Sequence, residues 1–252
     1  MTNETSLRSG NPRGAIEPGL YRINYGRMLL RDLWHYSTGF RSFRVLLAWR
    51  KTSHRCSVSR WLPYRINEVR ASAQELHPEA LAALRNMRSD LPLNLLEICY
   101  VMRDPRTVNE HGDAIGASWY LTDGHAVMIN LIYMKTPSKS SPGGFREARV
   151  TYVTSARAGD RYLVTCNRPQ NTQFRPAAMV ARVKLADASP NMTLQRHYRR
   201  IAGRRDLISG LTTDASIALL ERLSDLEYAP RVANGCMERV PAVAGTSATP
   251  SS

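Results

Sequence analysis

The chain has 252 residues, and 43% of them are hydrophobic, so it is long enough to bury a sizeable core. It carries 35 Lys and Arg against 21 Asp and Glu, which gives a formal net charge of +14 at pH 7. Its apolar runs fall far short of the ~20 residues that a membrane-spanning helix needs. These properties argue against a membrane-spanning protein and favour a globular one with an anionic partner.

The positive charge is concentrated in the first quarter of the chain. Residues 1–70 hold 13 Lys and Arg and only 4 Asp and Glu, a net charge of +9. Only four basic residues in the whole chain are lysines, and such a bias toward arginine can also come from genome composition. Genome composition does not explain why the charge gathers in residues 1–70, so this region is a candidate binding element.

The N-terminal part of the chain divides into three segments. Residues 1–19 are rich in Asn, Ser, Gly and Pro, which predicts a disordered arm. Residues 20–36 place leucines on one side of a helical wheel and basic residues on another, which predicts a helix. Residues 40–51 fit a strand by alternation and a helix less cleanly, so both assignments stay open. We take residues 20–70 as a basic, aromatic-rich N-terminal element.

The rest of the chain predicts a sheet between helices. Residues 72–90 have helical spacing, and two further helices are expected near 193–202 and from 213 onward. Between them, alternating apolar residues predict strands at 94–102, 118–122, 125–134, 149–157, 161–167 and 178–185, the last as an edge strand. The 125–134 strand is apolar on both faces, which predicts a central position. Residues 241–252 are expected to be disordered.

This order of elements predicts the fold class and the domains. Strands grouped in the middle of the chain with helices at both ends favour an α+β fold with a mostly antiparallel sheet of about five strands. Residues 71–240 are predicted to form this α+β domain. The four cysteines are separated by 43, 67 and 70 residues and form no close pair, and the N-terminus has no apolar signal region. We therefore expect a cytoplasmic protein with reduced thiols.

No residue pattern indicates a cofactor or a metal. None of the six histidines is paired at helical spacing, so we expect no metal site and infer no small-molecule ligand. Cys166 ends a strand and is expected to be a buried small hydrophobic residue. His197 shares a helix with several arginines and is expected on a solvated basic face, where nearby charge lowers its pKa. An enzyme centred on Cys166 with His197 or His125 remains an alternative.

One stretch of the sequence predicts a hairpin whose polar tip is a candidate functional site. The tip carries Arg157, Asp160 and Arg161 in the sequence REARVTYVTSARAGDRYLVTCNRP. Ala-Gly-Asp suits a tight turn with glycine at a position of positive φ, and Asp is common in turns for its backbone hydrogen bonds. We interpret the tip as the polar rim of a sheet.

The same stretch also contains a pattern that resembles those of other proteins. The pattern RVTYVTSARAGDRYLVTCNRP, followed some twenty-five residues later by LQRHYRR, resembles a family of uncharacterised bacterial proteins of unknown function. In that pattern, two strands around a polar turn end in Thr-x-Asn and precede a helix with His and several Arg, here Thr151–Asn167 and Leu194–Arg200. The likeness covers roughly residues 72–235, and this chain departs from it in its short C-terminal tail. The resemblance supports the fold class and implies no activity.

The N-terminal element is the strongest candidate for a site. Arginine mixed with tryptophan and tyrosine is typical of membrane interfaces and also of surfaces that bind single-stranded nucleic acid. No nucleic-acid-binding motif is present, so nucleic acid is the second choice. We expect a binding or accessory domain, not an enzyme, that docks on an anionic membrane or protein surface and is membrane-peripheral. The candidate docking residues are Arg27, Arg31, Trp34, Arg41, Arg44, Trp49, Arg50 and Lys51.

Overall fold

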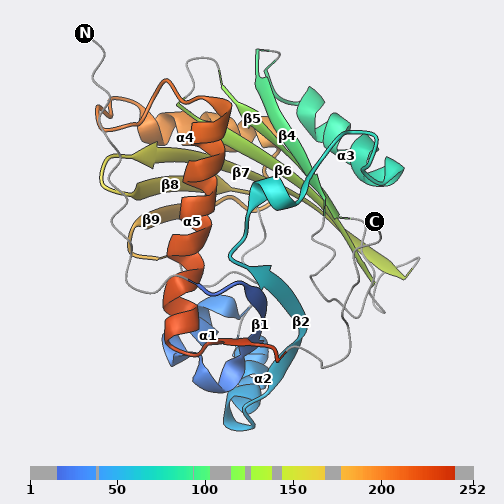
Figure 1. Cartoon of the computed structure of the whole chain (residues 1–252), viewed down its shortest axis with the longest axis vertical. Helices are drawn as coiled ribbons and strands as arrows, with labels where there is room; N and C mark the ends of the chain where they lie inside the picture. Colours follow the sequence, from blue (N-terminus) through green and yellow to red (C-terminus); the bar gives the residue numbers. More distant parts are fainter. Residues whose placement is uncertain are drawn as a thin grey trace, which may run out of the picture.

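The computed structural model describes residues 16–37, 40–92, 94–102, 115–122, 126–137, 144–167 and 177–241. Most of the predicted C-terminal tail and most of the predicted N-terminal arm therefore lie outside the described residues, as do residues 123–125. Within the described ranges the chain forms a large sheet with helices on both faces and a small sheet at one end of the molecule (Figure 1).

The large sheet has seven strands in sequential order, each beside the next. They are β3 (Arg70–Ala71), β4 (Leu96–Met102), β5 (Ile115–Leu121), β6 (Met128–Pro137), β7 (Phe145–Arg157), β8 (Arg161–Cys166) and β9 (Val180–Lys184). All neighbours are antiparallel except β8 and β9, which are parallel.

The α+β class is thus confirmed, but the predicted size of the mostly antiparallel sheet, about five strands, was wrong. Seven strands form a mixed sheet, because the two-residue β3 is too short to show alternation and β9 returns to the edge of β8 in the parallel direction. The expected helices are also not clearly at both ends of the described chain. The first and last elements of the described chain are strands, and they pair with each other.

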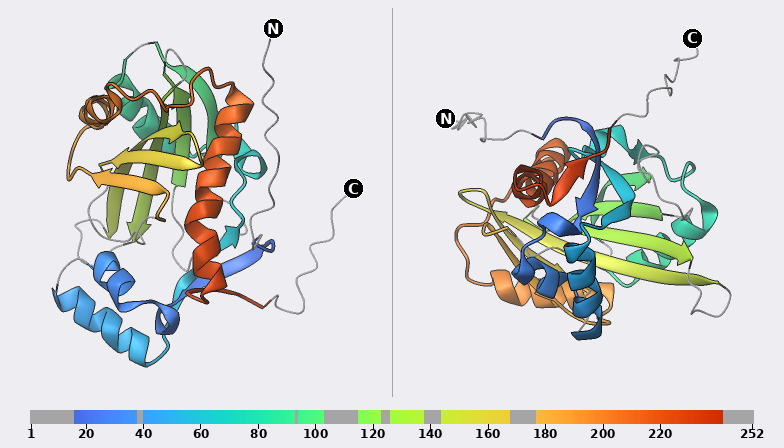
Figure 2. Two further views of the ribbon diagram at one scale, coloured as in Figure 1. Left: turned by 90° about the vertical axis from the view of Figure 1, so that its left-hand side faces the viewer. Right: turned by 90° about the horizontal axis from the view of Figure 1, so that it is seen from below.

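The prediction that the strand at 125–134 is central is confirmed by the burial of β6. Ile129, Leu131 and Tyr133 belong to the core under the helices α3 (Pro78–Ser89) and α4 (Pro190–Ile201). Met128 belongs to the core on the opposite face, which α5 (Thr213–Ala233) covers. The sheet is therefore the middle layer of three, as the two views of Figure 2 show. A strand between two helical layers has no polar face, which explains its sequence.

The three helices on the large sheet begin at capped N-termini. The His77 ring accepts a hydrogen bond from the Glu79 amide before α3, and Ser189 and Thr212 cap α4 and α5 in the same way. Pro230 lies inside the last turn of α5. Among the helices in the described ranges, none combines the length and the apolar composition that crossing a bilayer requires.

The small sheet joins the two ends of the described chain. Its order is β10-β1-β2, with β10 (Met237–Arg239) and β2 (Arg55–Leu62) both antiparallel to β1 (Gly19–Asn24). The predicted helix over 20–36 was therefore wrong in its first half. Tyr21 and Ile23 are buried and alternate with Leu20 and Arg22, which is a strand pattern.

Two short helices lie on the small sheet. The 3-10 turn η1 (Tyr25–Arg27) follows β1, then come α1 (Leu30–Tyr36) and α2 (Phe40–Lys51). The ambiguous segment 40–51 is thus helical. Leu33 of α1 and Leu46 of α2 pack into a small core with Ile23 of β1, Tyr25 of η1, and Met28 and Cys236 from the adjoining segments. A second 3-10 turn, η2 (Ile66–Glu68), leads from β2 to the large sheet.

The hairpin tip between β7 and β8 is held by ion pairs. Gly159 and Asp160 both have positive φ, which a tight turn requires and glycine adopts without strain. Arg157 donates to the Asp206 carboxylate, and Arg222 of α5 donates to Asp160 at 2.8 Å. Both pairs tie the tip to neighbouring segments, which supports its interpretation as a structural rim.

Candidate functional site

Apolar side chains are exposed on α1 and α2 to an unusual degree. Of the ten large hydrophobic side chains that are exposed among the described residues, six lie between residues 29 and 49. Their exposed fractions are Leu29 45%, Leu30 52%, Trp34 57%, Phe40 67%, Val45 50% and Trp49 37%. We call these six residues, together with the exposed basic residues Arg27, Arg31, Arg41, Arg44 and Lys51, the basic-apolar face.

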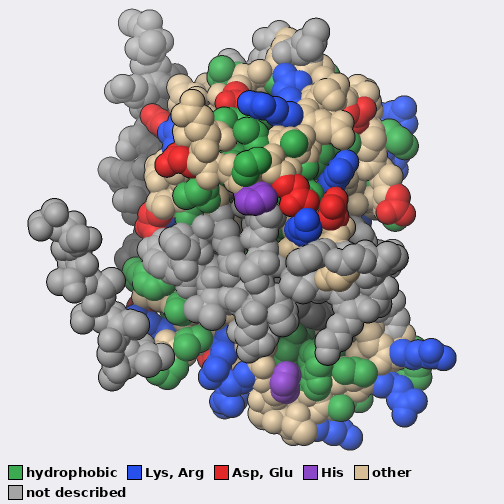
Figure 3. Space-filling view, turned by 90° about the vertical axis from the view of Figure 1, so that its right-hand side faces the viewer, with side chains coloured by type: hydrophobic (Ala, Val, Ile, Leu, Met, Phe, Trp, Pro, Cys, Tyr) green, Lys and Arg blue, Asp and Glu red, His purple; other side chains and the backbone are tan. Residues whose placement is uncertain are grey.

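The face follows from the periodicity of α2. Leu46 points into the small core, with Phe43 and Arg50 beside it on the wheel. Arg41, Arg44 and Lys51 recur at intervals of three and seven, so they form a basic stripe on the opposite side. The apolar residues Val45 and Trp49 flank the stripe on one side, and Phe40 and Leu47 flank it on the other. At the lower end of the molecule, Figure 3 shows hydrophobic side chains with Lys and Arg around them.

Most of the predicted docking residues lie together on this face. Seven of the eight candidates are exposed and come from η1, α1 and α2. Arg50 differs, because it is half-buried and its Nε donates to the Met28 carbonyl at 3.0 Å. Arg50 therefore ties α2 to the segment before α1. Sequence reasoning missed the exposed Leu29, Leu30, Phe40 and Val45, since their spacing is also that of a buried stripe.

Aromatic rings fix the two tryptophans of the face. Trp34 packs edge-on against Phe43, with ring centroids 5.0 Å apart, and so joins α1 to α2. Trp49 packs against Tyr25 at 5.1 Å and against His54 at 4.8 Å. Each indole thus has one side supported by another ring and still retains an exposed part. Supported rings lose little conformational freedom when they bind a partner.

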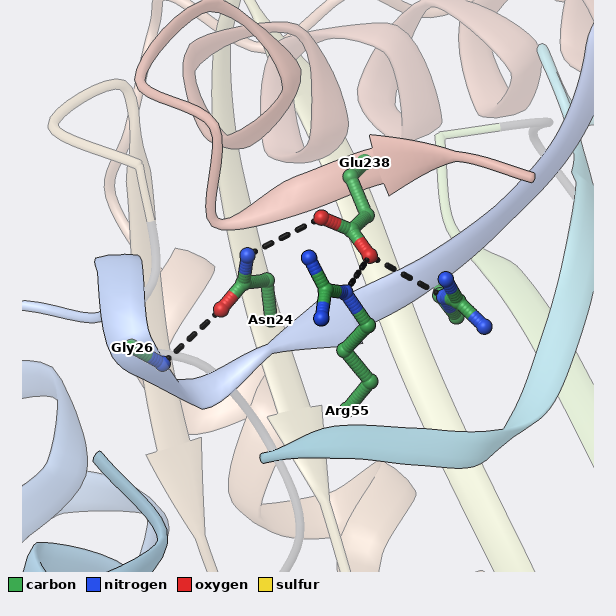
Figure 4. A network of polar contacts seen from close by, with 5 residues as sticks. Asn24, Gly26, Arg55 and Glu238 are labelled. Carbon is green, nitrogen blue, oxygen red and sulfur yellow. Dashed lines mark hydrogen bonds and ion pairs between the residues drawn. The ribbon is translucent and has the colours of Figure 1, made fainter. Parts of the chain in front are cut away.

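A polar network holds the sheet beneath the face (Figure 4). The Glu238 carboxylate of β10 accepts hydrogen bonds from Arg22 at 3.0 Å, from Asn24 at 2.9 Å and from Arg55. Asn24 also accepts from the amide of Gly26, the second residue of η1. Burial alone raises the pKa of Glu238, but the hydrogen bonds from Arg55, Asn24 and Arg22 outweigh it and hold the pKa below its usual value. A single carboxylate thus joins all three strands.

A second polar cluster is buried under α4. The His197 ring lies between two hydroxyls, with Nε2 2.9 Å from Ser155 Oγ and Nδ1 2.9 Å from Thr165 Oγ1. Arg200 donates to Thr165 Oγ1 at 2.7 Å and to the Val164 carbonyl at 2.6 Å. Neutral imidazole has one donor and one acceptor nitrogen, and a hydroxyl can serve as either. The ring is therefore fully satisfied without charge.

The expectation of a solvated His197 was wrong. Its side chain has 0% exposure, because Leu194 and His197 share the inward face of α4 while Arg196 and Arg199 point outward. Burial, and then the charge of Arg200, lower the pKa of His197 from 6.5 to about 3. The direction of the shift was expected, but desolvation is its main cause and the arginine charge is secondary. The histidine stays neutral and has a structural role.

This pKa predicts how stability depends on pH. Between pH 6.5 and 3 the unfolded chain protonates His197 and the folded chain does not, so the unfolded state binds more protons. The free energy of unfolding therefore falls as the pH drops below 6.5, by up to about 1.4 kcal/mol per pH unit from this group. We expect urea unfolding to show a loss of about 2 kcal/mol between pH 7 and pH 5 that is absent in His197→Leu. Equal slopes in both proteins contradict this assignment.

Of the two pairings that the sequence left open for an enzyme centre, the structure does not bring Cys166 and His197 together on one face of the sheet. Cys166 is 0% exposed, as expected of a buried small residue. Thr165 contacts His197, and successive strand residues point to opposite faces, so Cys166 points away from α4. His125 lies outside the described residues. No group of three or more His, Cys, Asp or Glu that could hold a metal is found in the described part of the chain.

The fold and the site define an α+β protein whose small sheet carries a helical face of mixed basic and apolar character. No family model matches the chain, and neither a curated protein nor a solved structure matches it. The resemblance to uncharacterised bacterial proteins therefore stays a prediction. The residues that carry it, Thr165 and His197, contact each other in the buried cluster.

Proposed function

We propose that this protein is a non-enzymatic binding or accessory domain that docks peripherally on an anionic membrane surface through the basic-apolar face. The observation that carries this proposal is the exposure of aliphatic and aromatic side chains beside a basic stripe on one helix. Apolar side chains of this kind insert at the boundary between lipid headgroups and acyl chains, while the cations contact the headgroups. Arginine and lysine also bury their apolar stems beside such residues and keep the charged end in the headgroup layer.

The charge of the region favours an anionic surface. Residues 25–55 contain seven Lys and Arg, and the only acidic residue among them is Asp32. Asp32 is half-buried, so the outward field of the region is almost entirely positive. Each basic residue near an anionic leaflet contributes about 1 kcal/mol of attraction. Charge therefore supplies the long-range attraction, and apolar insertion holds the protein after contact.

A nucleic-acid partner is the alternative that the same arginines allow. Bases stack on aromatic rings, and Trp34 and Trp49 could serve in that way. The face also exposes Leu29, Leu30 and Val45, however, and aliphatic side chains offer no stacking surface. A lipid interface uses these aliphatic side chains and a nucleic acid does not. This difference makes the membrane the better-supported partner.

The test is co-sedimentation of the purified chain with anionic and neutral liposomes, with tryptophan emission read in parallel. We expect pelleting with anionic vesicles and a blue shift, because Trp34 leaves water when the face inserts. The shift is expected to be reduced in Trp34→Phe and lost in Trp34→Phe/Trp49→Phe, which keep apolar rings but remove the reporters, while pelleting persists. Trp119 is buried in the large sheet, so Trp119→Phe is the matched control that keeps the shift.

Two results would count against membrane docking. The first is the absence of pelleting at low salt, where electrostatic attraction is strongest. The second is tight binding of a single-stranded oligonucleotide by a protein that does not bind vesicles. The affinity for the oligonucleotide would then fall steeply as the salt concentration rises. The second result would indicate that the same arginines bind nucleic acid.

A further inference from the structure

A groove lies at the other end of the molecule, between α4 and the segment that joins it to β9. Its volume is about 650 Å³, within the usual range of small-molecule sites. One wall is the outward face of α4, and the other is the end of β9 with the turn that follows. The lining residues are Lys184, Leu185, Ala186, Ala188, Asn191, Met192, Gln195, Arg196 and Arg199.

The polar lining of the groove is cationic. It has two arginines and a lysine, Arg196, Arg199 and Lys184, and two amide side chains, with no carboxylate among the lining residues. Two acidic residues lie close to the lining residues, one in sequence and one through a hydrogen bond, but neither lines the groove. Asp187 is exposed on the turn, and Asp90 accepts a hydrogen bond from the Asn191 amide at 2.9 Å. The groove therefore offers several donors and a positive field to an anion.

The arrangement of α4 places these donors on one side. Asn191, Gln195 and Arg199 recur every four residues, and Arg196 lies between them on the exposed side. Arg200 points the other way, into the sheet, where it donates to Val164 and Thr165. Burial lowers the pKa of Arg200 first, and the charges of Arg204 and Arg196 lower it further, which agrees with dense positive charge along this helix.

The groove also has an apolar part. Leu185, Ala186 and Ala188 come from the turn, and Met192 of α4 is 63% exposed beside them. A methionine side chain is flexible and adapts to the shape of an apolar group. A bare inorganic anion would not use this surface. An organic anion with an apolar body would contact the cations and the apolar part at once.

We propose that this groove binds a small soluble phosphate monoester, with Arg196 and Arg199 on the phosphate and Met192 against the organic body. Arginine pairs with both carboxylate and phosphate through two parallel hydrogen bonds. A phosphate monoester has three acceptor oxygens and a charge of about −1.5 to −2 at pH 7, so it can engage both arginines at once better than a single carboxylate can. None of the residues that line the groove belongs to the basic-apolar face, and α4 lies toward the end of the long axis opposite α1 and α2 (Figure 1). Docking through α1 and α2 would use none of the residues of the groove, so we take its ligand to be a soluble ester and not a lipid headgroup.

Phenyl phosphate is a suitable probe because it joins a phosphate to an apolar ring. In titrations of the full chain, we expect saturable binding of one molecule, tighter than that of inorganic phosphate. The double variant Arg196→Gln/Arg199→Gln should bind at least about tenfold more weakly, since it loses two charge-assisted contacts. The matched control is Arg85→Gln/Arg161→Gln, which removes two exposed arginines outside the groove and should bind as the original chain does.

A third variant and a second readout complete the test. Met192→Glu places a carboxylate in the groove and should also weaken binding, with circular dichroism showing that the fold is kept. Vesicle pelleting should be unchanged in Arg196→Gln/Arg199→Gln, and a loss of pelleting would assign the groove to lipid headgroups and overturn a soluble ligand. The proposal also fails if phenyl phosphate shows no saturation up to about 10 mM, or if the control variant loses as much affinity.

Discussion

Removing the basic stripe of α2 is expected to weaken binding to anionic vesicles about a hundredfold. The variant Arg41→Gln/Arg44→Gln/Lys51→Gln takes away three exposed cations and keeps side chains that are good helix formers. Each cation near an anionic leaflet contributes about 1 kcal/mol, so three contribute roughly 3 kcal/mol, which corresponds to a factor of about 100. The measurement is the partition coefficient from co-sedimentation at fixed lipid composition and ionic strength.

The control for this variant removes the same charge elsewhere. Arg85, Arg161 and Arg205 are exposed residues outside the basic-apolar face, and changing all three to glutamine lowers the net charge equally. This control should lose much less affinity, because charges farther from the lipid than a Debye length are screened. Equal losses in both triple variants would mean that net charge alone attracts the protein, and the basic-apolar face would not be a docking site.

Replacing His197 with leucine is expected to destabilise the fold by about 2–4 kcal/mol. Leucine keeps the packing of the buried position, but it removes the hydrogen bond between His197 and Ser155 and the one between His197 and Thr165. A buried hydroxyl that loses its hydrogen bond costs about 1–3 kcal/mol. The measurement is the free energy of unfolding from urea titration at pH 7, where His197 is neutral in the folded chain.

A second substitution distinguishes lost hydrogen bonds from lost packing. Adding Ser155→Ala to His197→Leu removes the orphaned hydroxyl, so it should recover part of the lost stability. Arg196→Gln, on the exposed side of the same helix, should change stability by no more than about 0.5 kcal/mol. If the double variant is less stable than His197→Leu by the full cost of a separate Ser155→Ala change, the two residues act independently and the cluster has no coupled role.

Local signals were sufficient for the parts of the fold that depend on neighbours in sequence. The β7–β8 hairpin, the central strand β6 and helix α3 all follow from alternation, turn residues and helical spacing. The small sheet depends instead on pairing between Tyr21 and Arg239, which no local pattern reveals. The parallel placement of β9 likewise depends on a crossover and not on its own residues.

The candidate site was only partly predictable for a similar reason. The basic and aromatic residues of α1 and α2 are visible in the composition of residues 21–55. Whether Leu29, Leu30 and Phe40 are buried depends on which elements cover them, and the small core takes only Leu33 and Leu46 from the two helices. In the same way, the arginines around His197 indicated a solvated helix, whereas the position of α4 on the sheet buries the one ring that faces it.

The hydrogen bonds of Glu238 link the two ends of the chain, so the small sheet can be completed only late in synthesis. Asn24 and Glu238 are hydrogen-bonded although they lie 214 residues apart in the chain. At a synthesis rate of about 5–20 residues per second, the first strand of the small sheet waits roughly 10–40 seconds for its partner β10 to be translated. During this time the basic-apolar face has no complete sheet beneath it. A nascent chain on the ribosome therefore lacks the finished basic-apolar face, and the proposed docking would follow translation.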